Sequence, residues 1–410
     1  MAILPDRFLS GPVLRRGCTV YNKKGMLFDE VIGQEQPKAL FRQMIRTDRM
    51  PHALLLLAAP GSGGLPLALA LAQYLLCEQK GDQEEACGTC NHCRKAAKYV
   101  HPDLHFSFPT IGTNALSDHF LPQWREALFA NPYLEINDWL QHIGAENKQG
   151  NINKDECLNI IRKLSLKSFE SPRKVVILWL PEYLGNEGNR LLKVIEEPPD
   201  QTVFILVAEN QELILNTILS RCQLVKINPL SDEDIATALS DRNSIPAEDA
   251  MAMAQLASGN FNDALKASQH EESDQAVRFL DWMRRCYKGQ PKEMVDWAND
   301  FAGQGRENQK HFLQYALHFW REFLVLKTRG EAVVRLRERE KQTAMGMAKV
   351  IQLPQLEAII QLLDDCMFYV ERNAHPKLLF LDASIQINHI IKHWSAYQEQ
   401  QKARLAKGLA

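Results

Sequence analysis

The sequence lacks both a long hydrophobic run and an excess of charge of either sign. Its 410 residues contain 48 Lys and Arg against 50 Asp and Glu, which gives a formal net charge of −2 at pH 7. A nearly neutral chain gives no global sign of binding to nucleic acid or to a membrane surface, so such contacts would need a local patch or a partner. The most apolar stretches, such as residues 54–57 and 175–180, have the length of strands and are too short to cross a bilayer.

Cysteines are few outside one cluster, and the sequence does not begin with a recognisable signal peptide. The total of nine is odd, which does not suit a framework of paired disulfides and favours the reducing cytoplasm. Residues 1–25 fit poorly with the rest of the chain, whereas residues 26–33 have the character of a domain start. We expect residues 1–25 to be an N-terminal extension, made from an upstream start codon or forming an ordered arm, and we exclude them from the functional interpretation.

A phosphate-binding loop is present only in part. Residues 58–65 read Ala-Ala-Pro-Gly-Ser-Gly-Gly-Leu and lie between an apolar run at 53–57 and a helical run at 67–77. Strand, glycine-rich loop and helix are the setting of the pattern G-x-x-x-x-G-K-[ST], whose backbone N–H groups cradle phosphates. An ordinary glycine turn after a strand would give the same run, and the loop alone does not separate these two interpretations.

The residues missing from this loop are those that carry its chemistry. Gly61 and Gly63 suit a tight turn at a helix start, but Gly64 stands in the place of the lysine and Leu65 in the place of the Ser or Thr. The lysine reaches the β- and γ-phosphates of a nucleotide, and the hydroxyl holds Mg²⁺. The loop can therefore keep its shape while its chemistry is lost.

An acidic pair is missing as well. Residues 175–178 predict a continuous buried strand, and Trp179-Leu180-Pro181-Glu182 comes directly after it. In a P-loop ATPase an acidic pair ends this strand, where it holds Mg²⁺ and positions water. Only Glu182 is acidic here, and it comes late, so the metal-binding aspartate is absent.

Four cysteines have the spacing of a metal site. Cys77, Cys87, Cys90 and Cys93 follow the pattern C-x9-C-x2-C-x2-C. Four thiolates at short spacing can form a tetrahedral shell around Zn²⁺, and the lack of an open position or a water-activating carboxylate predicts a structural site. His92 could compete as a ligand. The alternatives are free thiols that cluster by chance, or a redox pair.

Strand-like and helix-like patterns alternate over residues 30–228, which predicts a parallel, doubly wound sheet. Beyond this region the strands stop, and helical patterns continue to residue 410. Residues 109–150 contain several prolines and glycines and read as a surface embellishment with one or two short helices. An aromatic stripe in the C-terminal part is more typical of a core or subunit interface than of a cofactor site; it comprises Phe312, Tyr315, Phe319, Trp320 and Phe323.

Helix boundaries can be predicted at three places in the core. The spacing of Asn153 and Glu156 is that of a capping box and predicts a helix to about Phe169, with an apolar side that includes Leu166. Residues 189–197 predict a helix that Pro198 and Pro199 stop. Residues 213–219 predict a shorter helix before the last strand.

Several short motifs occur together in the order found in bacterial clamp loaders. They are Val31-Ile32-Gly33-Gln34, the four-cysteine cluster, His101-Pro102-Asp103, residues 189–199 and Ser220-Arg221-Cys222. With these motifs the chain resembles the delta-prime subunit family of DNA polymerase III, a family of AAA+ proteins. The resemblance covers residues 26–270 well and residues 271–410 loosely, chiefly through residues 371–378.

The resemblance implies a fold and a domain plan. Residues 26–229 would form an α/β AAA+ core with a parallel sheet, similar to P-loop NTPases. Residues 230–270 would form a small helical lid, and residues 271–410 an all-α C-terminal collar domain. Within the core, the resemblance implies a zinc module at residues 77–93 and an insertion at residues 109–150.

The resemblance also implies a role for Arg221. In clamp-loader ATPases the Ser-Arg-Cys triplet presents an arginine finger to ATP bound by the neighbouring subunit, and Ser220 and Arg221 match its first two positions. A guanidinium suits this task because it stays charged and meets a γ-phosphate in a bidentate way. The alternative for Arg221 is a local salt bridge or a helix C-cap.

Two further positions depart from the active relatives. Asn262 stands where they have an arginine that senses the γ-phosphate, and Glu209 falls near the position where they have a threonine. A carboxylate anion at that position would repel a phosphate. Together with Gly64 and Leu65, these departures predict a subunit that does not hydrolyse ATP but can complete a partner's site.

The function implied by the resemblance is that of a non-catalytic clamp-loader subunit in the replicative DNA polymerase holoenzyme, located in the cytoplasm. The expected partners are gamma/tau-type ATPase subunits and the delta subunit in a hetero-oligomeric ring, and indirectly the sliding clamp and primed DNA. We expect no membrane partner. The expected cofactor is structural Zn²⁺, and we expect no ATP hydrolysis by this chain itself.

Two other functions compete with this one. An ATP-hydrolysing clamp-loader subunit of the gamma type is disfavoured by Gly64, Leu65 and Asn262. A DNA-binding protein that uses the cysteine cluster as a zinc ribbon would need more basic and aromatic residues than the cluster has nearby. Those present are Arg94, Lys95, Lys98 and Tyr99.

Overall fold

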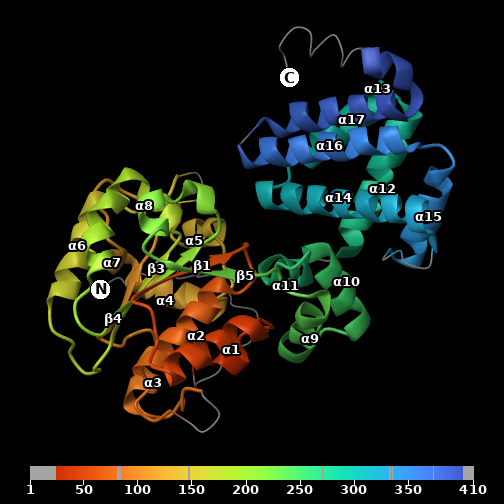
Figure 1. Ribbon diagram of the computed structural model, residues 1–410. Coiled ribbons are helices and arrows are strands. Elements are labelled where there is room, and N and C mark those ends of the chain that lie inside the picture. Colours follow the sequence, from red (N-terminus) through yellow and green to blue (C-terminus); the bar gives the residue numbers. More distant parts are fainter. Residues whose placement is uncertain are drawn as a thin grey trace, which may run out of the picture. The chain divides into compact units, whose positions relative to one another are not determined.

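The computed structural model describes residues 25–80, 85–145, 148–269, 272–331, 334, 336–372 and 374–399. The predicted N-terminal extension therefore lies outside the described residues, apart from Gly25. The chain divides into two compact units, Met1–Leu265 and Lys266–Ala410, and each is considered by itself (Figure 1). Within the described ranges, no helix combines the length and the apolar character needed to cross a membrane.

A five-stranded parallel sheet forms the centre of the first unit. Its strands lie in the order β2-β3-β4-β1-β5, and all neighbours are parallel. At the centre of the sheet, Leu55 of β1 lies beside Leu206 of β4 and Leu224 of β5. The predicted parallel α/β core is confirmed. The strands are β1 (Ala53–Ala58), β2 (Leu104–Ser107), β3 (Lys174–Trp179), β4 (Thr202–Ala208) and β5 (Gln223–Ile227).

Helices cover both faces of this sheet (Figure 1). The α-helices of the first unit are α1 (Glu35–Arg46), α2 (Gly64–Leu76), α3 (Asn91–Ala96), α4 (Leu121–Ala130), α5 (Ile136–His142), α6 (Lys154–Ser165), α7 (Leu192–Glu196), α8 (Asn216–Leu219), α9 (Asp232–Asn243) and α10 (Ala247–Ala257), and α11 (Phe261–Gln269) crosses the boundary. The 3₁₀ helices are η1 (Phe28–Glu30), η2 (Ser117–Phe120), η3 (Pro181–Leu191) and η4 (Gln211–Leu213).

Alternate residues of the strands serve two separate cores. Leu54 and Leu56 of β1 pack with α2, whose residues are all buried, while Leu55 packs on the other face with α6, α7 and α8. This alternation follows from the pleat of a strand, in which successive side chains point to opposite faces. Burial on both faces explains why the strands read as continuous apolar runs.

Three predicted helices differ from the observed ones. Helix α6 ends at Ser165, because the Lys174 ammonium takes up the carbonyl groups of Lys163, Leu164 and Leu166. Leu166, predicted on the buried side, is 65% exposed. The predicted helix 189–197 is α-helical only in α7, and the predicted helix 213–219 only in α8.

The interpretation of residues 109–150 as a surface embellishment is wrong. Helices α4 and α5 carry Trp124 and Trp139 into the core, where both are fully buried. The Trp124 ring stacks on Phe108 with 4.3 Å between centroids, and Trp139 Nε1 donates a hydrogen bond to the Pro109 carbonyl at 2.7 Å. Sequence patterns missed this because each tryptophan finds its partners on other elements.

The second unit is entirely helical in its described part, as predicted. The aromatic stripe of α14 is buried in its core, together with aromatic residues of α12, α13 and α17. The stripe is therefore a packing feature of this unit. The helices are α12 (Glu272–Lys288), α13 (Pro291–Ala302), α14 (Arg306–Arg329), α15 (Glu338–Ala348), α16 (Leu353–Glu371) and α17 (Pro376–Lys392).

The role of α4 in the core can be tested by replacing Trp124. We expect Trp124→Ala to lower the free energy of unfolding by about 3–5 kcal/mol, because it leaves a large cavity beside Phe108. Phe129→Ala on the same helix is the matched control, since Phe129 is 42% exposed, and should cost about 1 kcal/mol or less. Chemical unfolding followed by fluorescence measures both. Equal losses for the two variants would contradict this packing of α4.

Candidate functional site

The glycine loop makes a tight turn between β1 and α2. It follows β1 at the carboxyl edge of the sheet, where parallel sheets place their ligands. Gly61 and Gly63 have φ angles of +64° and +101°, values that residues with a side chain rarely adopt. Helix α2 then begins at Gly64. The turn expected from the sequence is thus present.

Little free space remains over the glycine loop. The cavity left over the loop has a volume of about 20 Å³, which holds about one water molecule. Phe261 N donates a hydrogen bond to the Gly61 carbonyl at 3.0 Å, and a Cβ atom at Gly61 would lie 1.6 Å from Asn260 Oδ1. Tyr133 lies against Gly63 from the segment between α4 and α5. The segment before α11 and the segment before α5 thus close over the loop.

Gly64 is constrained by its neighbours in the sheet. A Cβ atom at Gly64 would lie 2.5 Å from Ala58 Cβ and 3.2 Å from Val207 Cγ1. A lysine therefore cannot enter this position without movement of the backbone. The absence of a lysine at position 64 therefore agrees with the close packing around it.

Two acids, Glu182 and Glu209, lie near the loop. Glu182 Oε1 accepts hydrogen bonds from the backbone N–H groups of Glu209 (2.5 Å) and Asn210 (2.7 Å). Glu209 lines the small cavity, and burial, with help from Glu135 and Glu182, raises its pKa to about 8. Glu209 is therefore mainly neutral at pH 7, and the expectation of an anion at this position is wrong.

Asn262 takes part in a network within the first unit. Its side chain is buried, accepts a hydrogen bond from Asn131 Nδ2 at 2.6 Å and donates one to Asp138 Oδ2 at 2.6 Å. Asn260 similarly donates to Glu135 at 2.7 Å. The two asparagines join the start of α11 to the elements around α5.

Arg221 lies at the end of α8 and is partly exposed. Its Nε pairs with Glu196 Oε2 at 2.8 Å, and its Nη1 donates to the Thr217 carbonyl at 2.9 Å. Both interactions left open by the sequence, a salt bridge and a C-cap, are therefore present. Ser220 accepts a further contact from Nη1 at 3.3 Å.

The four predicted cysteines come together. Their sulfur atoms all lie within 4.8 Å of one another, and Cys87 Sγ and Cys93 Sγ are 3.8 Å apart. Tetrahedral Zn²⁺ with bonds of about 2.3 Å would separate its sulfurs by about 3.8 Å. The cluster can therefore bind a structural metal ion. The eight cysteines in the described part of the chain are all free thiols.

Backbone N–H groups surround this cluster. The Cys87 N–H donates to Cys77 Sγ (3.3 Å), the Cys90 N–H to Cys87 Sγ (3.3 Å) and the Cys93 N–H to Cys90 Sγ (3.4 Å). Burial raises the pKa of Cys77 and Cys93, whereas hydrogen bonds from Thr89 and Cys90 outweigh burial and lower the pKa of Cys87 to about 6. Such N–H donors suit thiolates that share a cation.

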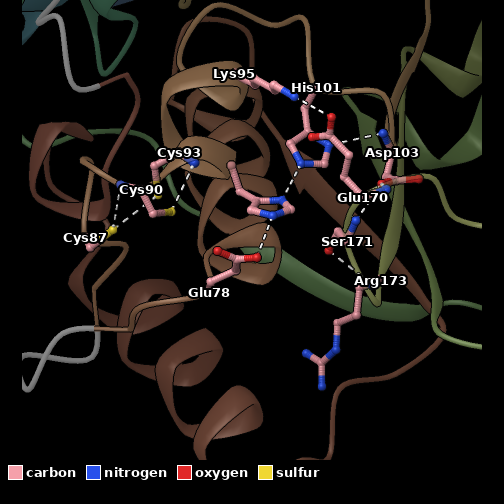
Figure 2. Close-up of polar contacts among 11 residues, drawn as sticks. Glu78, Cys87, Cys90, Cys93, Lys95, His101, Asp103, Glu170, Ser171 and Arg173 are labelled. Carbon is pink, nitrogen blue, oxygen red and sulfur yellow. Dashed lines mark hydrogen bonds and ion pairs between the residues drawn. The ribbon is translucent and has the colours of Figure 1, made fainter.

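His92 turns away from the cysteines and does not compete with them. Its ring contacts Glu78 on one side and His101 on the other, two residues that Figure 2 labels. Its Nε2 lies 2.8 Å from Glu78 Oε1, and its Nδ1 lies 2.7 Å from His101 Nε2. Asp103 N donates to His101 Nδ1 at 3.1 Å, so the hydrogen bonds assign the His101 proton to Nε2. The His92 and His101 rings thus form a continuous chain of hydrogen bonds between Glu78 and the Asp103 backbone.

A second metal site at these histidines does not fit the hydrogen bonds. Ligand atoms of His92, His101 and Glu170 lie within 4.8 Å of one another. However, His101 Nδ1 already accepts the N–H of Asp103. Binding a metal through Nε2 would leave the ring without any proton, whereas a ligating histidine normally donates through its other nitrogen. In the sequence, residues 101–103 stand out only as a motif, and nothing there indicates this chain of hydrogen bonds.

Comparison with known proteins relates most of the first unit to one family. Residues 33–231 match the family model described as DNA polymerase III, delta subunit. DNA polymerase III subunit delta' of Bacillus subtilis is 27% identical over 243 residues, which are 58% of this chain and 60% of that protein. The delta' subunit of Escherichia coli is 28% identical over 221 residues, 53% of this chain and 54% of that protein.

Subunits of the gamma and tau type are also similar. DNA polymerase III subunit tau of Bacillus subtilis is 22% identical over 384 residues, which are 88% of this chain and 61% of that protein. The chain spans little more than half the length of the two delta' relatives from Bacillus subtilis and Escherichia coli.

The raised pKa of Glu209 predicts a pH-dependent stability. Between the ordinary value of 4.5 and about 8, the folded chain holds a proton that the unfolded chain has released, so stability falls as pH rises through this window. Glu209→Gln keeps the shape and has no proton to lose. We expect it to be more stable than the wild type by roughly 1–3 kcal/mol at pH 8, with a smaller gain at pH 5.

Chemical unfolding at pH 5, 6.5 and 8 measures this difference. Glu212→Gln, an exposed residue of the neighbouring η4 turn, is the control. A gain for Glu209→Gln that does not grow with pH would contradict a buried, protonated carboxyl.

Proposed function

This chain belongs to the DNA polymerase III delta-prime family of clamp-loader subunits, and from that premise we propose that it is a non-catalytic member of the ring that loads a sliding clamp onto primed DNA. The observation that carries the proposal is the filled glycine loop. A nucleotide site usually has several hundred Å³, whereas about 20 Å³ remain here. A subunit of this kind contributes to ATP hydrolysis through its neighbours.

The loss of catalysis in cis is supported at several independent positions. Gly64 and Leu65 offer neither the lysine nor the hydroxyl that bind phosphate and Mg²⁺. Glu182 is engaged by backbone N–H groups. Asn262 is held by two other side chains. A rival role as a gamma-type ATPase would require all of these to change together.

Arg221 is the residue through which this chain would act in trans. Its salt bridge with Glu196 is partly exposed, with 31% and 56% of the two side chains accessible. Such pairs contribute at most about 1 kcal/mol, so the guanidinium can exchange Glu196 for a γ-phosphate of a docked neighbour. Ser220, which contacts Nη1, would help to orient it.

We assign Zn²⁺ to Cys77, Cys87, Cys90 and Cys93 in a structural role. The 3.8 Å separation of Cys87 and Cys93 sulfurs supports tetrahedral binding. The ion would join the end of α2 to the start of α3 and hold the segment that connects these two helices. Four protein ligands leave no position for a substrate.

The remaining parts would serve assembly. Residues 230–270 would act as a lid that closes on the glycine loop, and residues 271–410 as the collar through which the ring is held together. The partners would be gamma/tau-type ATPase subunits and the delta subunit, with the sliding clamp and primed DNA reached through them. A protein with this role would work with the replication machinery in the cytoplasm.

Arg221→Ala tests the role in trans. The variant should still co-purify with the ATPase and delta subunits, while ATP hydrolysis by the reconstituted ring falls several-fold, because an arginine finger contributes about 10³–10⁵ to kcat at the site it serves. Arg190→Ala, which removes an exposed, ion-paired arginine of η3, is the control and should leave ring activity unchanged. Full ATPase and clamp loading with Arg221→Ala would refute the proposed finger.

Metal content tests the cysteine assignment. Elemental analysis of the purified chain should give about one zinc ion per molecule, and Cys90→Ser should lower both the zinc content and the melting temperature. Cys222→Ser, which removes a thiol outside the cluster, should keep the zinc. A wild-type preparation that is folded and free of zinc would exclude the structural ion.

A further inference from the structure

The second unit contains a cavity that its own side chains leave open. The cavity has a volume of about 660 Å³ and is bounded by residues of α12, α15 and α17. Its floor is apolar, and Met283, Ile351 and Ile391 are all buried there. Every lining residue that the structure describes belongs to Lys266–Ala410, so the cavity is a feature of this unit alone.

A glycine keeps the rim of the cavity free of side chains. Gly346 lines the cavity and lies within α15. Its φ is not positive, so the backbone does not require glycine, and glycine is a poor helix former. A Cβ atom at Gly346 would meet no described neighbour within 4 Å outside its own stretch of helix. The space beside Gly346 is therefore large enough for an added group.

Positive charge predominates at the mouth of the cavity. Asp281, the one acid in the described lining, pairs with Arg285 at 2.8 Å. Arg284 is exposed beside it, and no carboxylate in the described ranges pairs with this guanidinium. Lys392 Nζ lies 5.0 Å from the centre of the Tyr287 ring, which also lines the cavity. An apolar interior is thus joined to a cationic entrance.

From this arrangement we propose that the cavity binds a small amphiphile, a linear carboxylic acid whose hydrocarbon chain lies between the three helices and whose carboxylate meets Arg284. Small-molecule sites usually have volumes of about 300–1,000 Å³ and mostly apolar walls with a few polar groups. Each CH₂ group removed from water adds to the affinity. A guanidinium has paired donors that match the two oxygens of a carboxylate.

A protein partner fits this cavity less well. A sphere with the volume of the cavity has a surface of only about 400 Å², whereas a stable protein interface covers about 800 Å² of each partner. A docked helix would be about 10–12 Å across and would need an open groove. The cavity is instead a single hollow with a buried floor, which favours a small ligand.

Titration of the full chain with decanoate tests this proposal, which does not depend on the role in clamp loading. Decanoate is used below the concentration at which it forms micelles, and decanol serves as the uncharged probe of the same length. Calorimetry should show saturable binding of about one decanoate per chain. Decanol should bind about ten-fold more weakly, because it lacks the carboxylate.

Gly346→Phe tests the location of the site. The added ring would occupy the rim and should weaken decanoate binding at least ten-fold, because it takes the space of the hydrocarbon chain. Gln342→Phe is the matched control, since Gln342 is exposed on the same helix and does not line the cavity. It should leave binding unchanged. Thermal unfolding of both variants checks that the helical unit remains folded.

Arg284→Gln tests the recognition of the carboxylate. The variant should lose the preference for decanoate over decanol while binding decanol as the wild type does. Lys292→Gln, which removes an exposed cation of α13 outside the cavity, should keep the preference.

Three results would overturn the proposal. They are the absence of saturable decanoate binding by the folded wild type, equal losses in Gly346→Phe and Gln342→Phe, and a preference for decanoate that survives in Arg284→Gln. If Gly346→Phe instead weakened binding to a purified gamma/tau-type ATPase while the wild type bound no decanoate, the cavity would be part of a protein interface, and the small-ligand site would again be refuted.

Discussion

Contact between Asn260 and Gly61 closes the carboxyl edge of the sheet over the glycine loop. The asparagine stands where even a methyl group on the glycine would collide with it, and Phe261 adds a backbone hydrogen bond to the same residue. Asn131, Glu135 and Asp138 hold this segment in turn. The segment before α11 is thereby fixed on the core.

The parallel core could be predicted because its strands are continuous apolar runs that alternate with helical patterns. The cysteine site could be predicted because its four ligands are close in sequence and their spacing is characteristic. The absence of the lysine and the hydroxyl could also be predicted, because Gly64 and Leu65 stand in their places in the sequence. The sequence could not indicate how little space remains over the glycine loop. Tyr133 and Asn260 pack against this loop, and they belong to segments about 70 and 200 residues further along the chain.

The errors have the same physical origin. Trp124 and Trp139 sit in a segment rich in turn residues, and their burial depends on partners on other elements. Helix α6 stops before the predicted end because Lys174, nine residues after Ser165, takes its last carbonyl groups. The charge at Glu209 was misjudged because desolvation is a property of the folded environment. The local sequence pattern contains no signal for the burial of the tryptophans, the end of α6 or the protonation of Glu209.

The crowding at Gly64 has an evolutionary consequence. Because a side chain there would meet Ala58 at the end of β1 and Val207 on β4, a substitution of Gly64 alone would disturb the core beneath the loop. A larger residue at position 64 would therefore need compensating changes in both strands. The identity of residue 64 is thus coupled to two strands of the sheet, and substitutions there would be accepted only together with changes in those strands.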